Sequence, residues 1–447
     1  MPTETPRPLV LYDVTRLVNR RRAPNPTGID RIDLEFAAAT FARFGADCLP
    51  VVLVGRHPVV LADERAAIVD LVGALGAAWS RGAVPDEAVA TRIDRLGIAA
   101  NIGYGTRRVE HDVATRRPGT GTSATAFARL ARHLARFRRL ARTRFAGTSL
   151  LGGRRVLYVN ASHEGVARRP GALDRLTRRA DLAVLAYIHD LMPLEVPQFS
   201  RADRITAFAA FVGELVRHRA TFVANSRMTA AALTGHLQRV APGVFPAPRV
   251  VHPGIERPQD AAGMWAPSEG GADFVVLGTI EPRKNHRMLL AIWREMIAEN
   301  DAPIPRLHII GRRGWDIDDV AAELDASAEL SGHVTEESGL DDRAVRARLR
   351  VATALLFPSF AEGFGLPLAE AAALGVPVIA SDLPVFREIV TTGLVALPPD
   401  DAAAWKAAIR AAAGDPTGFP VPQLSEELLD WPTQSRLFTD LVEKALR

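Results

Sequence analysis

Short apolar runs alternate with amphipathic stretches along almost the whole chain of 447 residues, and this alternation restricts the fold more than any other feature. Apolar runs of about four to eight residues are typical of strands buried on both faces of a parallel sheet, and the stretches between them are long enough to be helices. The sequence therefore predicts an α/β protein with parallel, doubly wound sheets. The clearest runs are Leu9–Val14, Leu49–Val54, Val156–Val159, Leu182–Ile188 and Thr221–Ala224, followed by Phe274–Leu277, Leu307–Ile310, Ala354–Phe357 and Pro377–Ala380.

A stretch rich in proline, glycine and alanine separates these two series of runs. Glu256–Gly271 has little apolar periodicity, which is typical of an interdomain linker. The length of the chain also favours more than one domain, because a single core rarely grows beyond about 250 to 300 residues. We expect an N-terminal Rossmann-like domain over residues 1–258, a linker over 259–271, a C-terminal Rossmann-like domain over 272–430 and a final helix over 431–447.

Composition narrows the class of protein. The longest apolar stretch is interrupted by Asp70, so we expect no segment of the roughly 20 apolar residues that cross a bilayer. Residues 1–8 lack the basic and apolar regions of a secretion signal, and the single cysteine, Cys48, cannot form an internal disulfide. These features favour a cytoplasmic protein.

Arginine is concentrated between Arg129 and Arg155, although the net charge of the chain is only +4. An apolar stripe at helical spacing runs through the arginine-rich part, and two interpretations of it stay open. Arg129–Arg144 could contact anionic lipid headgroups at the membrane face, or the stripe could pack on the N-terminal sheet while the arginines are simply hydrated. Few aromatic residues interleave with the arginines, so we do not expect nucleic acid as a partner. The stripe consists of Phe127, Leu130, Leu134, Phe137 and Leu140.

Charged residues and glycines follow the predicted strands of the second series. Ligands of open α/β sheets bind beyond the carboxyl ends of the strands, so these residues are expected to converge on one site. Arg283 and Lys284 follow Phe274–Leu277, and as adjacent cations they suit a diphosphate. Glu362 follows Ala354–Phe357 and Glu370 lies eight residues later. Carboxylates accept hydrogen bonds from vicinal hydroxyls such as those of a ribose or a hexose, although a helix cap and an exposed helical glutamate would be the ordinary alternative.

The segment between the two glutamates has features of an anion-binding helix start. Gly363 and Gly365 allow close approach of the backbone to a ligand, and Pro367 fits the first turn of a helix. A helix that begins here presents free backbone N–H groups and the positive end of its dipole. We therefore expect the donors of the site to include backbone amides as well as side chains.

Glu362-Gly363-Phe364-Gly365-Leu366-Pro367-Leu368-Ala369-Glu370 resembles the E-x7-E signature of the family 4 retaining glycosyltransferases, which have the GT-B fold. Gly278-Thr279-Ile280-Glu281-Pro282-Arg283-Lys284-Asn285 is similar to the phosphate-binding loop of that family, particularly of its bacterial mannosyltransferase-like group. The resemblance covers Phe274 to about Asp401 closely and the first half of the chain more loosely. It implies two Rossmann-like domains that face each other across a cleft, with the acceptor on the side of the N-terminal one, the nucleotide sugar in the C-terminal one and the final helix packing back across the linker.

The resemblance also implies roles for individual residues. Glu362 would contact the donor sugar near its reacting carbon and Glu370 would hold the nucleotide ribose, while the backbone amides of Phe364 to Leu366 would add donors. Arg283 and Lys284 would neutralise the diphosphate.

Three further positions are implied by the resemblance. His189 matches a histidine near the donor sugar, although a structural histidine at a strand end is the alternative. Gly28 matches the glycine turn that closes over the diphosphate, although a plain turn glycine would look the same. Thr279 stands where many relatives have an arginine, so the cation count of the phosphate loop is lower in this chain.

The sequence predicts neither a metal site nor a redox cofactor. Asp316-Ile317-Asp318 imitates a metal-binding D-x-D, but it lies where a helix should begin and we interpret it as capping acid. Cysteine and histidine do not cluster at metal-ligand spacing, and no G-x-G-x-x-G follows the first strand of either half, which argues against a dehydrogenase.

The resemblance implies a metal-independent enzyme that moves a hexose, most simply mannose from GDP-mannose, to a hydroxyl of a glycan acceptor with retention of configuration. We expect the acceptor to be a cell-surface polysaccharide or the O-antigen of a lipopolysaccharide, linked to a lipid diphosphate at the cytoplasmic membrane face. A front-face route is implied, in which the leaving phosphate takes the proton of the acceptor. A sugar-nucleotide epimerase or a phosphorylase of the same fold, and a non-catalytic nucleotide-sugar-binding module, remain the alternatives.

Overall fold

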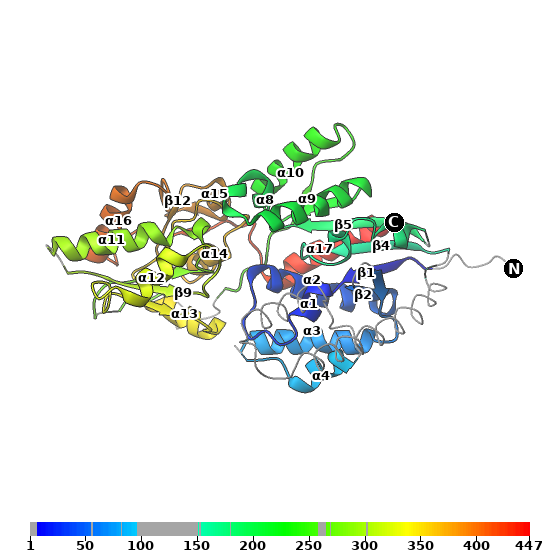
Figure 1. Ribbon diagram of the computed structural model, residues 1–447, viewed down its shortest axis with the longest axis horizontal. Coiled ribbons are helices and arrows are strands. Elements are labelled where there is room, and N and C mark those ends of the chain that lie inside the picture. Colours follow the sequence, from blue (N-terminus) through cyan, green and yellow to red (C-terminus); the bar gives the residue numbers. More distant parts are fainter. Residues whose placement is uncertain are drawn as a thin grey trace, which may run out of the picture.

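The computed structural model describes residues 7–54, 57–81, 83–95, 151, 153–178, 180–257, 265–268, 270–300 and 303–447. Within these ranges the chain forms two α/β domains that lie side by side, the N-terminal one on the right of Figure 1 and the C-terminal one on the left. Arg129–Arg144 and most of the predicted linker lie outside the described residues. No described helix is both long enough and apolar enough to cross a membrane.

The N-terminal domain is built on a seven-stranded sheet with the strand order β3-β2-β1-β4-β5-β6-β7. Every neighbouring pair is parallel except β2 and β3. The strands are β1 (Leu9–Asp13), β2 (Cys48–Val54), β3 (His57–Val60), β4 (Arg155–Asn160), β5 (Asp181–Ile188), β6 (Thr221–Ala224) and β7 (Arg249–Val250). The helices are α1 (Thr15–Asn19), α2 (Gly28–Phe44), α3 (Arg65–Trp79), α4 (Glu87–Arg95), α7 (Asp174–Thr177), α8 (Met192–Glu195), α9 (Ala202–Arg217) and α10 (Arg227–Val240), with 3-10 turns η1 (Gly45–Asp47), η3 (Val166–Arg168) and η4 (Pro197–Phe199).

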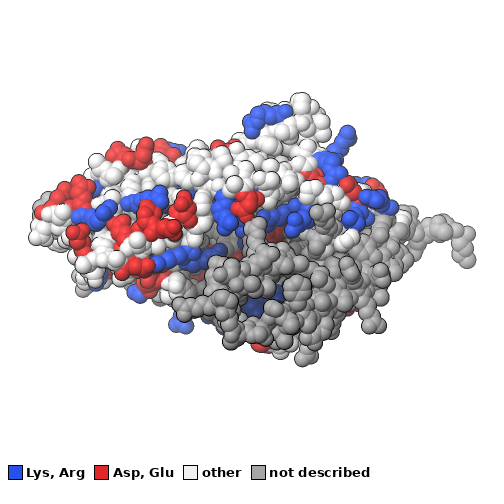
Figure 2. All heavy atoms as spheres, viewed as in Figure 1, with Lys and Arg blue, Asp and Glu red and all other residues white. Residues whose placement is uncertain are grey.

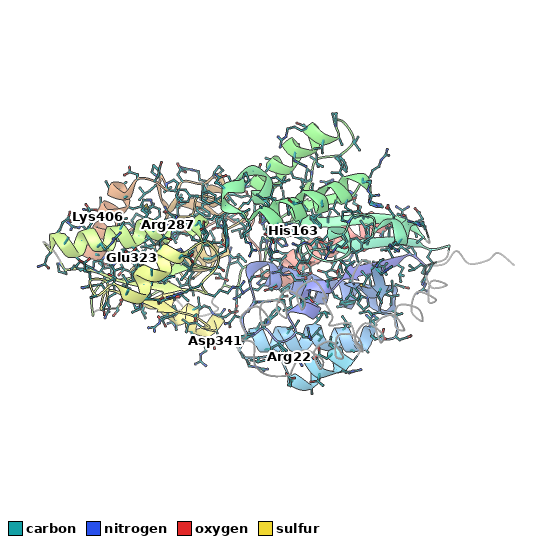
Figure 3. The ribbon with its side chains drawn as sticks, in the orientation of Figure 1. Arg22, His163, Arg287, Glu323, Asp341 and Lys406 are labelled. Atoms are coloured by element: carbon teal, nitrogen blue, oxygen red, sulfur yellow. The ribbon has the colours of Figure 1, made fainter. Side chains whose placement is uncertain are left out.

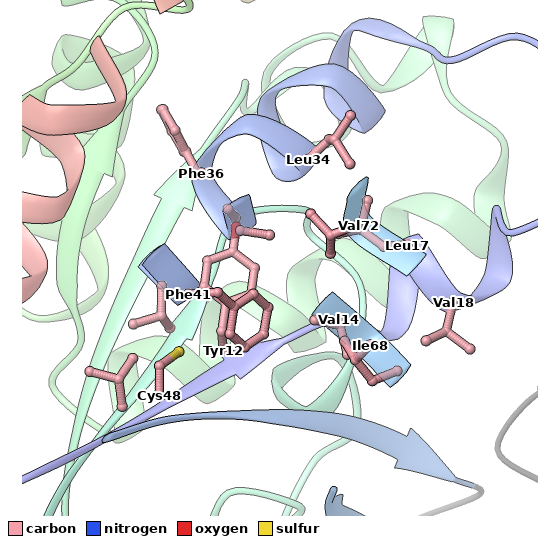
Figure 4. Packing of buried hydrophobic residues seen from close by; sticks show 14 of the residues in the cluster. Tyr12, Val14, Leu17, Val18, Leu34, Phe36, Phe41, Cys48, Ile68 and Val72 are labelled. Atoms are coloured by element: carbon pink, nitrogen blue, oxygen red, sulfur yellow. The ribbon is translucent and has the colours of Figure 1, made fainter. Parts of the chain in front are cut away.

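Helices cover both faces of this sheet because successive strand residues point to opposite faces. Tyr12 and Val14 pack with α1, α2 and α3 on one face, whereas Leu11 packs with α7, α9 and α10 on the other. Figure 4 shows the first cluster, in which the Tyr12 and Phe41 rings lie 6.0 Å apart. Burial on both faces explains why the strands read as continuous apolar runs.

The C-terminal domain is built on a six-stranded, fully parallel sheet with the order β10-β9-β8-β11-β12-β14. Helices α11, α12 and α16 cover one face, and α13, α14 and α15 lie against the other. The strands are β8 (Asp273–Leu277), β9 (Arg306–Ile310), β10 (Val334–Glu337), β11 (Ala354–Phe357), β12 (Val378–Ser381) and β14 (Val395–Leu397), and a separate hairpin joins β13 (Val390–Thr392) to β15 (Gln423–Leu424). The helices are η6 (Pro282–Lys284), α11 (His286–Glu299), α12 (Asp318–Ala326), α13 (Asp342–Val351), α14 (Leu366–Ala373), α15 (Pro384–Ile389) and α16 (Ala402–Gly414).

The last helix, α17 (Trp431–Leu446), returns to the N-terminal domain, where Phe438 stacks on Phe36 of α2 with ring centroids 4.0 Å apart. The returning chain crosses the outgoing one at Gly254, where a Cβ atom would lie 2.4 Å from the Cα of Trp431. The Ile255 N–H also donates to the Leu429 carbonyl at 3.0 Å. The two domains are therefore joined by two segments of chain that contact each other.

The structure confirms the α/β fold class with two Rossmann-like sheets. Each predicted run forms a strand whose ends lie within one residue of the expected ones. The strands that the apolar pattern missed are short or lie at an edge, as with β10, whose sequence Val-Thr-Glu-Glu is half acidic. An edge strand has fewer buried neighbours, so its composition carries a weaker signal.

Candidate functional site

The two loops that carry the predicted site follow neighbouring strands at the centre of the C-terminal sheet. In the order β10-β9-β8-β11-β12-β14, the direction of the chain connections reverses between β8 and β11. In doubly wound sheets, ligands bind at the carboxyl ends of the strands at this switch point. Lys284 follows β8 and Glu362 follows β11, so the sheet order brings both to that point.

The loop after β8 is shaped by glycine and asparagine. Gly278 has a φ of 134° and Asn285 a φ of 57°, conformations that glycine and asparagine adopt most readily. The Gly278 N–H donates to the Ile310 carbonyl at 3.0 Å, and a Cβ at Gly311 would lie 1.8 Å from the Gly278 oxygen. The loops after β8 and β9 therefore lie in direct backbone contact.

Glu362 is the centre of a buried cluster of charges. Its Oε1 accepts from Lys284 Nζ at 2.6 Å and lies 2.6 Å from Arg283 Nη1. Only 8% of Glu362 is exposed. Burial alone would raise the pKa of this carboxyl, but Arg283 and Lys284 outweigh it and lower the pKa to about 2. Glu362 is therefore ionised at every pH at which the protein would be assayed.

The two cations of the cluster have different environments. Arg283 Nη2 donates to Glu281 Oε1 at 2.7 Å and Nη1 donates to the Ala361 carbonyl at 2.6 Å, so its fork is fully engaged. Lys284 Nζ lies 4.4 Å from the centre of the Phe357 ring, and burial lowers the pKa of its amine. Because Arg283 is held between two carboxylates, Lys284 is the better placed of the two to turn toward a diphosphate.

The start of α14 lies against the N-terminal domain. A Cβ at Gly363 would lie 2.1 Å from the His189 carbonyl oxygen, so only glycine fits there. The Gly363 carbonyl accepts from the Ser226 hydroxyl at 2.8 Å and the Thr229 hydroxyl at 3.2 Å, both at the start of α10. Gly365 caps α14 with a φ of 118°. The predicted glycines thus hold the glutamate loop in contact with both domains.

Phe364 and Leu366 flank that second glycine and lie at the same junction. Phe364 is buried, with its ring 6.0 Å from the imidazole of His252. A Cβ at Gly28 would lie 2.9 Å from Leu366 Cδ1, which places the N-terminal turn of α2 beside the start of α14. The structure therefore brings Gly28 to the glutamate loop, as expected of a turn that covers the donor.

Glu370 lies one helical turn farther along α14 and faces α2. Arg31 of α2 lies 3.9 Å from Glu370 Oε1 and donates through both of its terminal nitrogens to Asp342, which begins α13. Burial raises the pKa of Glu370, and the charge of Arg31 opposes that shift. Arg31 therefore joins the predicted ribose carboxylate to the opposite domain. Its role is not visible in the sequence, because the amphipathic pattern of α2 does not distinguish Arg31 from other surface arginines.

His189 lies at the end of β5 but is held by its own domain. Its Nε2 lies 2.7 Å from the Ala161 carbonyl, and its backbone N–H donates to Nε2 of His163 at 2.9 Å. Burial lowers the pKa of His189 to about 3, so the imidazole is neutral. The next residue, Asp190, lies near Glu362 and Arg283, and burial raises its pKa to about 6. His163, labelled in Figure 3, and Asp190 are thus neighbours that the sequence pattern did not single out.

Two cations approach the loops after β8 and β9 in addition to the predicted pair. Arg312 is exposed, and its carbonyl accepts from the Ile280 N–H at 2.9 Å, beside Thr279. Burial is the largest of the effects that lower the pKa of Arg20 in the N-terminal domain. The charges of Arg16 and Arg312 lower this pKa further, so Arg312 lies close enough to act on Arg20. These arginines add positive charge next to the position where Thr279 provides none.

A grouping of potential metal ligands lies elsewhere, on α7 and α9 of the N-terminal domain. Asp174, Glu214 and His218 offer ligand atoms within 4.8 Å of one another. Arg217 donates to both carboxylates, however, and the Gly171 N–H donates to Glu214 at 3.2 Å. We interpret the grouping as an ion-pair network that ties α7 to α9. Asp318, in the D-x-D segment, begins α12 but does not cap it, because the N-cap residue is Ile317 and no side chain makes a capping hydrogen bond there.

Comparison with known proteins gives the family of the domain that carries this site. The profile of the family described as glycosyl transferases group 1 matches residues 271–415. The C-terminal domain is similar to the domains of this family. Its match begins just before β8 and ends after α16, so the Lys284 loop and both glutamates belong to it.

Bacterial mannosyltransferases are among the relatives of this chain. The chain is 29% identical to the serotype-specific mannosyltransferase WbdA of Escherichia coli over 215 residues, which is 45% of this chain and 26% of WbdA. It is 38% identical to the O-antigen chain mannosyltransferase B of Escherichia coli over 125 residues, 28% of this chain and 32% of that protein. It is 51% identical over 82 residues to the O-antigen chain mannosyltransferase RfbU of Salmonella typhimurium, 18% of this chain and 23% of RfbU. The chain thus spans about a quarter to a third of the length of these relatives.

A solved structure supports the fold over the whole chain. Anabaena Alr3699/HepE in complex with UDP superposes with a TM-score of 0.54 at 13% identity, covering 98% of this chain and 100% of that one. At this identity the likeness concerns the fold alone. It agrees with the GT-B arrangement of two Rossmann-like domains seen in Figure 1.

Proposed function

We propose that this protein is a retaining, metal-independent hexosyltransferase that moves mannose from GDP-mannose to a hydroxyl of a glycan acceptor. The observation that carries the proposal is the buried cluster of Glu362, Arg283 and Lys284 at the switch point of the domain that matches the group 1 glycosyltransferases. Glu370 lies on α14, the helix that follows the Glu362 loop. The mannosyltransferases among the relatives favour mannose as the sugar and O-antigen or another cell-surface polysaccharide as the product.

The charges of the cluster suit a donor with a diphosphate leaving group. The bond between the anomeric carbon and the diphosphate breaks while a bond from that carbon to the acceptor oxygen forms, and the acceptor proton passes to the leaving phosphate. The expelled diphosphate gains negative charge, which Lys284 and the N–H groups at the start of α14 are positioned to stabilise. Arg283 fixes the Glu362 carboxylate, which would accept hydrogen bonds from sugar hydroxyls.

The donor assignment is tested with a panel of nucleotide sugars. The protein is incubated with GDP-mannose, GDP-fucose, UDP-glucose, UDP-galactose and UDP-N-acetylglucosamine, each with a mannose-containing glycan acceptor, and the released nucleotide is measured. We expect release of GDP from GDP-mannose and an α-linked product by NMR. Absence of release from every donor would contradict the transferase function, and release from a UDP sugar alone would contradict the choice of mannose.

We also propose that the acceptor is linked to a lipid diphosphate and that the protein meets it at the cytoplasmic face of the membrane. Arg129–Arg144, which lie outside the described residues, would attract anionic headgroups, with each basic residue contributing about 1 kcal/mol near the surface. Such attraction is screened over about 8 Å at physiological ionic strength, so it must weaken as salt rises. Co-sedimentation with anionic and neutral vesicles at two salt concentrations tests it, and equal, negligible binding to both at low salt would contradict it.

A further inference from the structure

A cavity of about 210 Å³ opens where the two domains meet, beside the loop that carries Lys284. At about 30 Å³ per molecule it would hold about seven waters, which is room for one sugar ring rather than for a nucleotide sugar. Its wall includes Phe199 of η4 in the N-terminal domain and Phe360 of the loop after β11. Both domains therefore contribute to the cavity, and it is complete only when they are in contact.

The two phenylalanines form a stacked pair across the domain boundary. Their ring centroids lie 5.3 Å apart at an interplanar angle of 14°, and both rings remain partly exposed. The Phe360 N–H donates to the Arg283 carbonyl at 2.9 Å, which fixes the ring next to the charged cluster. An aromatic face carries partial negative charge and attracts the weakly positive C–H groups of a pyranose ring.

The carboxylate of Glu281 forms a polar part of the cavity wall. Both hydrogen bonds from Arg283 to Glu281 fall on Oε1, so the second oxygen of that carboxylate can accept from a ligand hydroxyl. His286 also lines the cavity, but both of its ring nitrogens are closed off from solvent, so they are not ligand contacts.

The backbone at the rim of the cavity is also unusual. Asn285 and Asp316 both line it and both have a positive φ, of 57° and 52°. Residues held in the left-handed region are found preferentially at binding sites. Arg287, labelled in Figure 3 near the start of α11, forms another part of the rim.

The position of the cavity distinguishes it from the expected donor site. Glu370 lies on α14, which packs on one face of the C-terminal sheet, whereas the cavity is lined by the starts of α11 and α12, which pack on the other face. Glu362 lies between Glu370 and the cavity, and Arg283 links it to Glu281 in the cavity wall. A ribose at Glu370 and a sugar in the cavity would thus lie on opposite sides of the carboxylate assigned to the reacting sugar.

We propose that this cavity binds the sugar unit of the glycan acceptor that receives the transferred hexose. The sugar ring would pack against the stacked pair of Phe199 and Phe360 with a hydroxyl toward Glu281. This assignment rests on the proposed transferase function for the role of the bound sugar as acceptor, while the binding of a sugar ring here is independent of it.

Binding is tested by saturation-transfer NMR with a panel of methyl pyranosides (mannose, glucose, galactose and N-acetylglucosamine), with GDP at saturating concentration to occupy the donor site. We expect at least one glycoside to give signal with the wild-type protein and to lose it with Phe199→Ala, while Phe199→Tyr retains it. Phe245→Ala is the matched control, because Phe245 forms a similar ring pair with Phe222, 5.5 Å apart, away from the domain boundary. Thermal unfolding and the Kd for GDP establish that each variant is folded.

Two outcomes would overturn the proposal: no glycoside gives signal, or the signal of Phe199→Ala equals that of the wild type. Kinetics extend the test, since Phe199→Ala should raise the acceptor KM at least tenfold and change the donor KM less than twofold. Equal changes in both constants would also overturn it. Because the NMR measurement needs no turnover, a failure of the donor panel would contradict the transferase function without affecting this result.

Discussion

Replacement of Glu362 by glutamine gives the most direct test of the charge cluster, because the amide keeps the shape of the carboxylate and removes only its charge. In the wild-type protein, one carboxylate oxygen lies 2.6 Å from both Arg283 Nη1 and Lys284 Nζ. Glu362→Gln would leave Lys284 buried without a counter-ion and Arg283 with Glu281 alone. We therefore expect the C-terminal domain to lose stability as well as activity.

The size of the loss follows from the pKa of the carboxyl, which falls from 4.5 to about 2 in the folded protein. At about 1.36 kcal/mol per unit, ionised Glu362 contributes about 3 kcal/mol at neutral pH. Because the folded pKa is the lower one, this contribution is fully present above pH 4.5 and is lost as the pH falls toward 2. For a domain of this size, the Tm of Glu362→Gln should be about 6 to 12 °C below that of the wild type at pH 7.5.

Differential scanning calorimetry at pH 7.5 and pH 4 measures both the loss and its pH dependence. The Tm difference between wild type and Glu362→Gln should shrink at pH 4, because only the wild type loses stability by protonation. Asp325→Asn is a control, since its exposed pair with Arg313 should contribute little. Adding Lys284→Met to Glu362→Gln should recover part of the loss. A difference below about 2 °C at pH 7.5, or one that grows at pH 4, would refute the reasoning.

Three other predictions concern catalysis and donor binding. Lys284→Ala should cost about 2 to 4 kcal/mol of transition-state stabilisation, read from kcat/KM, and turnover within threefold of wild type would contradict its role. Glu370→Ala should weaken the binding of GDP by calorimetry, whereas Glu362→Ala should leave that binding nearly intact and abolish transfer; the reverse pattern would exchange the two assignments. Activity should survive EDTA, and a complete loss that magnesium or manganese restores would reveal a metal site.

Much of the architecture is determined locally and can therefore be predicted from sequence. A parallel strand buried on both faces must be continuously apolar, so each central strand is visible as a run, and the site residues follow directly from the strand ends. For this reason the sequence predicts Lys284, Glu362 and Glu370 as residues of one site. The sequence alone also shows that this loop has Thr279 where many relatives have an arginine.

Contacts between distant segments were decided only by the tertiary structure. Lys284 and Glu362 meet because β8 and β11 are neighbours in the sheet, an order that no local pattern specifies. Closure of the two domains places Arg31 beside Glu370 and Phe199 on Phe360. His189 Nε2 likewise lies beside the Ala161 carbonyl, a pairing that no local pattern indicates. Sequence periodicity reports how each element is buried, whereas sheet order and domain closure depend on packing summed over the whole chain, so these pairings emerge only in the folded protein.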